Sequence, residues 1–198
     1  MLAVYPLTVV LTICQQESPL AQESVPAMDA EFTPLDIAVL TVSDSRDESS
    51  DTSGALLVSR LQDAGHRLFE RALCADDIYE IRARVARWIA DERPQVVITT
   101  GGTGMTGRDG TPEAVIPLLD KQIPGFGEMF RVLSWDKIGP STLQSRCLAG
   151  VANGCYIFCL PGSSGACADG WDQLISRQLD TRSRPCNLAE LLPRLKEQ

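Results

Sequence analysis

Residues 99–114, TTGGTGMTGRDGTPEA, combine five glycines with threonine hydroxyls and a single Arg-Asp pair. Glycines in succession let backbone N–H groups approach and surround an anion, and Thr100 and Thr103 add hydroxyl donors. The alternative is a surface loop whose glycines serve only to turn the chain. Because the segment follows a predicted strand, where loops tend to carry function, we interpret it as a phosphate-binding loop.

Two common phosphate-loop patterns do not describe this segment. Residues 102–107 match G-x-G-x-x-G, but three residues separate the match from the helix signals at Thr111 and Pro112. The match also follows the third predicted strand, whereas the dinucleotide fingerprint follows the first strand and opens a helix at once. The Gly-Lys-Ser/Thr ending of a Walker A loop is missing, since the segment contains no lysine.

Asp109 is an electrostatic misfit beside a phosphate cradle, because its carboxylate would repel the ligand unless a cation lay between them. Its presence predicts Mg²⁺, which binds one or two carboxylates together with phosphate oxygens and water. Asp76 or Asp77 is the expected second ligand, and Arg108 could balance charge on a transferring phosphoryl group. The alternative is that the two adjacent aspartates cap the helix expected from Ile78, and each aspartate could fill one of the two roles.

Apolar runs of strand length alternate with segments of helical period along the chain. Strands are predicted for residues 35–43, 67–74, 95–100 and 155–160. Helices are predicted for residues 52–64, from 78 until Pro94, from 111, and for 125–133, 142–152 and 164–179. This order predicts an α/β fold, a three-layer domain with a mostly parallel, Rossmann-like sheet between helices.

Ligands of such folds lie beyond the carboxyl ends of the strands. Ser43 and Asp44 follow the first predicted strand, the glycine segment follows the third, and Pro161 and Gly162 follow the last. The acidic corner at residues 76–77 follows the second. We therefore expect these four segments to meet at one edge of the sheet.

Composition narrows the range of partners. The formal net charge is -8, from 26 acidic and 18 basic residues, and no basic run occurs, which argues against nucleic acid or an anionic membrane. The seven cysteines are odd in number and scattered, so we expect reduced, mostly buried thiols in a cytoplasmic protein and no zinc site. The single histidine, His66, follows a helix-ending glycine and is expected at the surface or on an edge strand.

Residues 1–34 differ from the rest of the chain. Their apolar run before Cys14 lacks the basic residues of a secretory signal and is too short to span a membrane. We expect a disordered or mis-annotated extension, with Met28 as a candidate natural start. Residues 35–198 then form the domain.

The glycine segment, TTGGTG followed by RD-x-TPEA, resembles the signature of the MoaB/Mog family of molybdenum cofactor biosynthesis proteins, which includes the G domain of gephyrin. Further blocks resemble the family in the same order: TVSD at 41–44, PGFGE at 124–128, STLQSR at 141–146 and LPG at 160–162. Residues 144–153 and 181–187 are more similar to the MoaB branch. Gly107 and Gly110 depart from the usual pattern and could loosen the placement of Asp109.

The resemblance implies a domain that assembles as a homotrimer or homohexamer and binds molybdopterin, a pterin with a terminal phosphate. Active members adenylylate that phosphate with Mg-ATP and release pyrophosphate; the alternative is a catalytically inactive molybdopterin-binding or scaffold protein. The tungsten route offers an equivalent step, and the molybdenum-inserting enzyme is a possible partner.

The family's functional residues transfer to matching positions of this sequence. Asp109 and Asp76 correspond to the catalytic, metal-binding aspartates, with Asp77 as the alternative for the second. The resemblance assigns substrate and nucleotide binding to Ser43, Asp44, Thr100, Gly101, Gly102, Thr103, Gly104, Arg108, Thr111, Glu113, Ser145, Arg146, Pro161 and Gly162.

Overall fold

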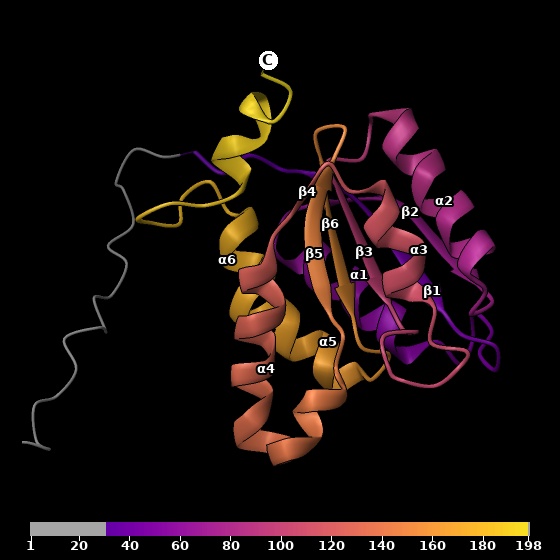
Figure 1. Ribbon diagram of the computed structural model, residues 1–198. Coiled ribbons are helices and arrows are strands. Elements are labelled where there is room, and N and C mark those ends of the chain that lie inside the picture. The colour runs from indigo at the N-terminus through magenta and orange to yellow at the C-terminus, as the bar shows by residue number, and fades with distance from the viewer. Residues whose placement is uncertain (1–30, 198) are drawn as a thin grey trace, which may run out of the picture.

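Six strands form one sheet in the order β2-β1-β3-β6-β5-β4 (Figure 1). The computed structural model describes residues 31–197. The first four strands of that order are mutually parallel, and β5 and β4 are antiparallel to their neighbours. The strands are β1 (Asp36–Val42), β2 (Arg67–Cys74), β3 (Val96–Thr100), β4 (Lys121–Gln122), β5 (Leu148–Ala152) and β6 (Cys155–Leu160).

Helices cover both faces of the sheet, as the three-layer prediction requires (Figure 1). One face packs against α1 (Thr52–Asp63), α4 (Pro124–Ile138) and the continuous helical segment α5 (Ser164–Gly170), η3 (Trp171–Ile175, a π-helix) and α6 (Ser176–Leu179). The other face packs against α2 (Ile78–Asp91) and α3 (Thr111–Val115). Short 3₁₀ helices are η1 (Ile116–Leu118), η2 (Gly139–Gln144) and η4 (Ala189–Arg194).

Alternation along β1 shows why the sheet needs helices on both sides. Ile37 and Val39 are buried with the α1 and α4 side chains, whereas Ala38 and Leu40 are buried with those of α2 and α3. Successive side chains of a strand point to opposite faces, so a run that is apolar throughout must be covered twice. The sequence-based expectation of an α/β fold is confirmed.

The helix predicted for residues 142–152 is wrong. The chain forms η2 up to Gln144 and then β5, which pairs with β6 through a tight hairpin. Asn153 (φ 47°) and Gly154 (φ 78°) occupy the left-handed region at its turn. Asn-Gly is the strongest short-range hairpin signal, because both central residues of the favoured turn need positive φ. That dipeptide should have indicated a strand before it.

His66 is buried and not at the surface, and it directly precedes the edge strand β2, which was the other position expected for it. It is 5% exposed, and its Nδ1 accepts a hydrogen bond from the N–H of Leu35 at 3.2 Å. Its ring lies between those of Phe32 (centroids 5.1 Å apart) and Trp171 (6.2 Å). Burial lowers the pKa of His66, so the ring is held in its neutral form.

The predicted boundary at residue 34 cuts into the folded body. Thr181 donates its hydroxyl to the carbonyl of Glu31 at 2.7 Å and accepts the N–H of Thr33 at 3.2 Å. The Arg182 guanidinium lies 5.0 Å from the ring centroid of Phe32. Residues 31–34 are therefore part of the packed structure, and the expectations for residues 1–30 lie outside the described residues.

The cysteines of the described chain are all free thiols, and most of them are buried. Burial raises the pKa of Cys159 to about 12, so this thiol stays protonated. None of the helices within residues 31–197 has the length and apolarity needed to cross a membrane.

Candidate active site

The carboxyl ends of β1, β3 and β6 meet at Gly101. Its N–H donates to the carbonyl of Leu160 at 3.0 Å, and a Cβ on Gly101 would lie 2.1 Å from the carbonyl oxygen of Val42. A Cβ on Gly162 would in turn lie 3.3 Å from the Gly101 Cα. With a φ of +108°, residue 101 can only be glycine here. The predicted meeting of these strand ends is confirmed.

A cleft of about 440 Å³ opens beside this junction, between the loop that joins β3 to α3 and the start of α2. Asp76, Arg108, Asp109, Glu113 and Arg146 from the predicted set line the cleft, and so does Asp77. The structure thus brings together the side chains that the sequence assigned to charge and metal chemistry. The cleft walls also include Ile78, Tyr79, Met105, Thr106, Gly107 and Gly110.

The two adjacent aspartates have different partners. Asp77 caps α2, because its Oδ1 accepts the N–H groups of Tyr79 at 2.8 Å and Glu80 at 3.1 Å. Asp76 reaches across to the glycine loop, where its Oδ1 accepts the N–H of Gly110 at 3.0 Å. Of the two roles considered for this pair, capping belongs to Asp77, which leaves Asp76 to contact the glycine loop in the cleft that Asp109 also lines.

The Asp109 carboxylate lies inside its own loop. Its Oδ2 accepts the N–H of Thr106 at 2.7 Å and the Thr106 hydroxyl at 2.6 Å. A Cβ on Gly104 would approach that same oxygen to 2.8 Å. These donors, the Thr106 hydroxyl first, lower the pKa of Asp109, so the group is ionised at neutral pH. In this structure the N–H and hydroxyl of Thr106, which belong to the glycine loop, donate to the Asp109 carboxylate.

Negative charge accumulates at the mouth of the cleft. Burial raises the pKa of Asp76, and the nearby carboxylates of Asp109 and Asp44 raise it further. Asp44 is paired with Arg108 through two contacts of 2.7 and 2.9 Å, which lower the pKa of Asp44. A cation between Asp76 and Asp109 would relieve this repulsion.

The acidic residues do not form a complete metal cage. Among residues 31–197, no group of three or more His, Cys, Asp or Glu side chains is arranged to hold a metal ion. Asp76 and Asp109 supply two carboxylates, the number that Mg²⁺ commonly takes from a protein when phosphate oxygens and water complete its coordination. The donor set fits a magnesium ion that arrives with a phosphate ligand.

Arg146 braces the glycine loop from the opposite side. It donates to the carbonyl oxygens of Gly104 at 2.6 Å and Asp109 at 2.7 Å, and its other nitrogen pairs with the Glu113 carboxylate. That pair lowers the pKa of Glu113. One guanidinium therefore ties both ends of the loop to α3, a fork geometry that lysine lacks.

Three hydroxyl groups of the predicted binding site form hydrogen bonds within the protein. The Thr100 hydroxyl, fully buried, donates to the carbonyl of Pro161 at 3.0 Å, so the prediction that it donates to a ligand is wrong. Gly110 occupies the N-cap of α3, and the Thr111 hydroxyl donates to Gly101 O at 2.8 Å. Ser43 accepts two N–H groups of its own turn. The Thr100 and Thr111 hydroxyls thus satisfy backbone carbonyls at the packed strand ends.

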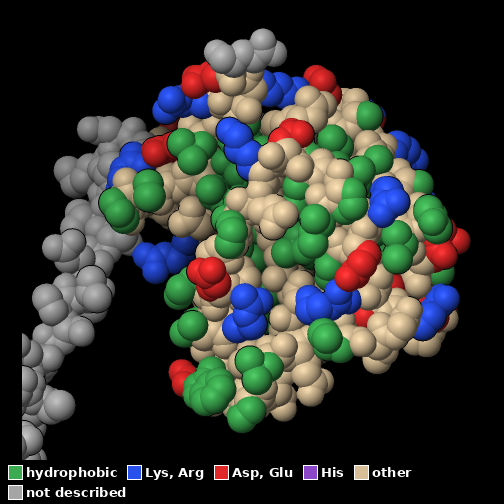
Figure 2. Space-filling view, viewed as in Figure 1, with side chains coloured by type: hydrophobic (Ala, Val, Ile, Leu, Met, Phe, Trp, Pro, Cys, Tyr) green, Lys and Arg blue, Asp and Glu red, His purple; other side chains and the backbone are tan. Residues whose placement is uncertain are grey.

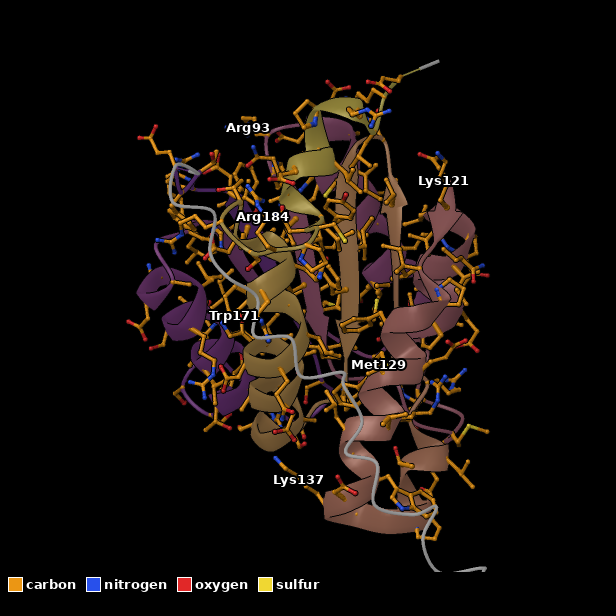
Figure 3. All side chains as sticks on the ribbon, turned by 90° about the vertical axis from the view of Figure 1, so that its left-hand side faces the viewer. Arg93, Lys121, Met129, Lys137, Trp171 and Arg184 are labelled. Atoms are coloured by element: carbon orange, nitrogen blue, oxygen red, sulfur yellow. The ribbon has the colours of Figure 1, made fainter. Side chains whose placement is uncertain are left out.

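The remaining predicted residues support the loop or line a second cavity. The Thr103 carbonyl accepts the N–H of Arg146, and Gly102 leaves room for the Thr111 hydroxyl 2.4 Å from where its Cβ would lie. Ser145 and Pro161 line a separate cavity of about 320 Å³. Lys137, labelled in Figure 3, lines it too and pairs with Asp169 of α5.

Thr106, Tyr79 and Met105 are among the cleft residues that sequence reasoning did not assign to the site. Thr106 lies three residues before Asp109, a spacing typical of local side-chain turns, and could have been found. Tyr79 lies off the apolar stripe of α2 that Ile81 and Val85 define, which is a signal for an exposed aromatic. Met105 has no distinguishing feature in the sequence.

The fold and cleft define an α/β domain of the class that binds ligands beyond the carboxyl ends of parallel strands. The family described as "Probable molybdopterin binding domain" matches residues 38–181. Molybdenum cofactor biosynthesis protein B of Escherichia coli K12 is 52% identical over 160 residues, covering 81% of this chain and 94% of that protein. The chain belongs to the MoaB/Mog family of molybdenum cofactor biosynthesis proteins.

Solved structures agree with this assignment. A crystal structure of molybdenum cofactor biosynthesis protein B superposes with a TM-score of 0.75 at 38% identity, covering 84% of this chain and 98% of that one. The tungsten cofactor synthesizing protein MoaB from Pyrococcus furiosus gives a TM-score of 0.69 at 31% identity, with coverages of 83% and 99%. The resemblance found in the sequence motifs is confirmed.

Proposed function

We propose that this protein adenylylates the terminal phosphate of molybdopterin with Mg-ATP and releases pyrophosphate. The observation that carries the proposal is the pair Asp76 and Asp109, which lie in one cleft and oppose each other electrostatically. A protein that only bound an anionic pterin would gain nothing from two carboxylates in one cleft. Free thiols throughout the described chain suit a reducing, cytoplasmic setting.

Two cavities at one edge of the sheet suit a reaction of two substrates. The acidic cleft takes the nucleotide, and the cavity lined by Ser145 and Pro161 takes the pterin. Ser145 and Arg146 are neighbours in sequence but line different cavities, so the link between the two sites is short. The terminal phosphate of the pterin would reach the nucleotide at this link, beside the glycine loop.

In the reaction, a phosphate oxygen of molybdopterin bonds to the α-phosphorus of ATP, and the bond from that phosphorus to the bridging oxygen breaks. Pyrophosphate leaves with the electron pair. Bound magnesium would supply neutralisation of the charge that develops on the phosphate oxygens. The attacking phosphate is already ionised, so the chain needs no general base.

The chain's own residues position the reactants. Arg146 keeps the loop closed against α3, and Arg108 presents its guanidinium at the mouth of the cleft while Asp44 orients it. Arginine is well suited to phosphate because its planar donors match two oxygens at once. Catalysis by positioning and charge, without a covalent intermediate, accounts for the chemistry of the cleft.

One observation favours the alternative, a molybdopterin-binding or scaffold protein without catalytic activity. The Asp109 carboxylate is satisfied by Thr106 and lies against Gly104, as a purely structural loop residue would. Metal binding would require Asp109 to exchange at least one of these donors for the cation. The two functions therefore differ in whether Asp109 turns outward when nucleotide binds.

Purified protein mixed with molybdopterin, ATP and Mg²⁺ separates the two functions by the amount of adenylylated pterin formed. We expect product with the wild type and its loss in Asp109→Asn and Asp76→Asn, with Asp77→Asn as the matched control because asparagine also caps helices. Pterin binding without product would establish the scaffold function. Activity of Asp109→Asn equal to that of the wild type would refute the metal-ligand role of Asp109.

We also propose that copies of the chain associate through α4 and η2, forming the trimer or hexamer that the family resemblance implies. Apolar side chains gather over this end of the molecule, at the lower left of Figure 2. They are 49–76% exposed and comprise Met129, Val132, Trp135, Ile138 and Leu143. An apolar surface of this kind is typical of a protein interface. The adenylylated product would pass from this assembly to the molybdenum-inserting enzyme.

A further inference from the structure

Two large apolar side chains stand exposed at the rim of the acidic cleft. Tyr79, in the first turn of α2, is 75% exposed, and Met105, in the glycine loop, is 68% exposed. Both line the cleft although they come from different elements. Apart from Ile78, the rest of the lining is polar or charged side chains and glycine, so Tyr79 and Met105 supply most of the exposed apolar surface of the cleft.

The Tyr79 ring is supported from one side by an arginine that is itself anchored. The Arg82 guanidinium carbon lies 5.8 Å from the ring centroid. Arg82 donates to the carbonyl oxygens of Glu113 at 2.8 Å and Ala114 at 3.3 Å, which ties it to α3. A cation–π contact with a fixed guanidinium restrains the orientation of the ring while most of its surface stays accessible.

We infer that Tyr79 and Met105 form a stacking platform for the nucleobase of the nucleotide. A planar base stacks on an aromatic ring, and a thioether adds a favourable contact at the ring edge. The apolar rim lies beside the carboxylates that would hold magnesium and phosphates, so base and phosphates occupy one continuous cleft. This inference rests on the proposed function, since it assigns the base-binding part of the same site.

The pterin is also a planar ring system, but the separate linings of the two cavities favour the base. The cavity assigned to the pterin is lined by Phe130, Ser145 and Pro161 and shares no lining residue with the acidic cleft. A base stacked on Tyr79 would leave that cavity open. Stacking on a single ring tolerates any base, and purines stack more strongly because of their larger surface.

Calorimetric titration with Mg-ATP and with magnesium tripolyphosphate tests the platform, because tripolyphosphate keeps the phosphates and lacks the base. We expect Tyr79→Ala to weaken ATP binding about tenfold and to leave tripolyphosphate binding unchanged. Tyr79→Phe should bind ATP within about twofold of the wild type, since the ring is kept. Leu191→Ala, which truncates an exposed apolar residue of η4, is the matched control.

Three results would overturn the inference while leaving the proposed function standing. Tyr79→Ala could bind ATP as the wild type does, could lose tripolyphosphate equally, or could lose molybdopterin instead of ATP. The third result would mean that the platform serves the pterin. Failure of the wild type to bind either ATP or tripolyphosphate would instead refute the nucleotide site, and the inference with it.

Discussion

Asp76 and Asp77 are consecutive residues whose carboxylates serve different elements. Asp76 Oδ1 accepts the N–H of Gly110 in the loop before α3, at 3.0 Å. Asp77 Oδ1 accepts the first N–H groups of α2, at 2.8 and 3.1 Å. One residue of register therefore separates a group that faces the cleft from a group that stabilises a helix, and the two can be tested separately.

Asp76→Ala and Asp77→Ala should have opposite consequences. Loss of Asp76 removes a carboxylate from the cleft, and we expect adenylylated pterin to fall to background with little loss of stability. Loss of Asp77 removes the cap of α2, which costs about 1 kcal/mol and lowers Tm by roughly 2–4 °C. Product formation by Asp77→Ala at a temperature well below Tm should stay near that of the wild type. Thermal melts measure the stability of each variant, and the adenylylation assay measures its activity. If Asp77→Ala were inactive but as stable as the wild type, the assignment of Asp77 to the helix cap would be wrong.

Asp76→Asn should make the ligand-free protein more stable at neutral pH. Folding raises the pKa of Asp76, chiefly through burial and then through Asp109 and Asp44, so the folded state favours the protonated form. Ionisation of this group as pH rises above the unfolded value of about 3.9 therefore works against folding. We expect a Tm gain of no more than about 2–4 °C near pH 7.5 that vanishes near pH 4. A lower Tm at neutral pH would show that the Gly110 hydrogen bond outweighs the repulsion.

His66 should make stability depend on pH. Its folded pKa is lowered by burial, Asp180 opposes that effect, and Arg67 adds to it. Below about pH 6.5 the unfolded chain binds a proton that the folded chain resists, so stability falls as pH falls. Urea unfolding at about pH 8 and pH 5.5 should show this loss in the wild type and a smaller one in His66→Asn, whose amide oxygen can still accept from Leu35. Equal losses in both proteins would assign the pH dependence to other groups.

Arg146→Lys should loosen the glycine loop without unfolding the domain. Lysine cannot donate to Gly104 O and Asp109 O while also pairing with Glu113, so the loop loses part of its brace. We expect faster amide hydrogen exchange confined to residues 102–110 and a rate of adenylylation lower by about 10²-fold, because small displacements at a reacting centre are costly. Arg93→Lys, an exposed pair with Asp91, is the control. If amide hydrogen exchange of the loop were the same in Arg146→Lys as in the wild type, Arg146 would not brace the loop.

Trp135→Asp should reduce the oligomeric mass. Trp135 is 54% exposed on α4, and a charge there would be buried unpaired in any interface that covers this face. Light scattering should give a multiple of the 21.5 kDa chain mass for the wild type and a smaller multiple for Trp135→Asp. Leu191→Asp, at an exposed position of η4, should keep the wild-type mass. An unchanged mass in Trp135→Asp would locate the interface elsewhere.

Local signals predicted most of the elements. Two patterns predicted their elements correctly: the apolar run at β1, and the stripe of Ile81, Val85 and Trp88 on α2. A strand or helix that buries a face must repeat apolar residues at its own period. β5 was not predicted, because the segment LAGVA is too short for its pattern to distinguish a strand from a helix. It forms a strand because it pairs with β6. The burial of His66 was not predicted either, because the rings that cover it, Phe32 and Trp171, are distant in sequence.

The sequence by itself determined the family, the three-layer order of elements and the set of charged residues at the strand ends, because these depend on residue type and on spacing along the chain. Only the tertiary structure decided which neighbour each group meets: Asp76 rather than Asp77 faces the glycine loop, Thr100 donates to Pro161, and Asp109 is held by Thr106. A side chain's partners and its pKa depend on distances of a few ångströms between segments far apart in the chain, and periodicity carries no information about them.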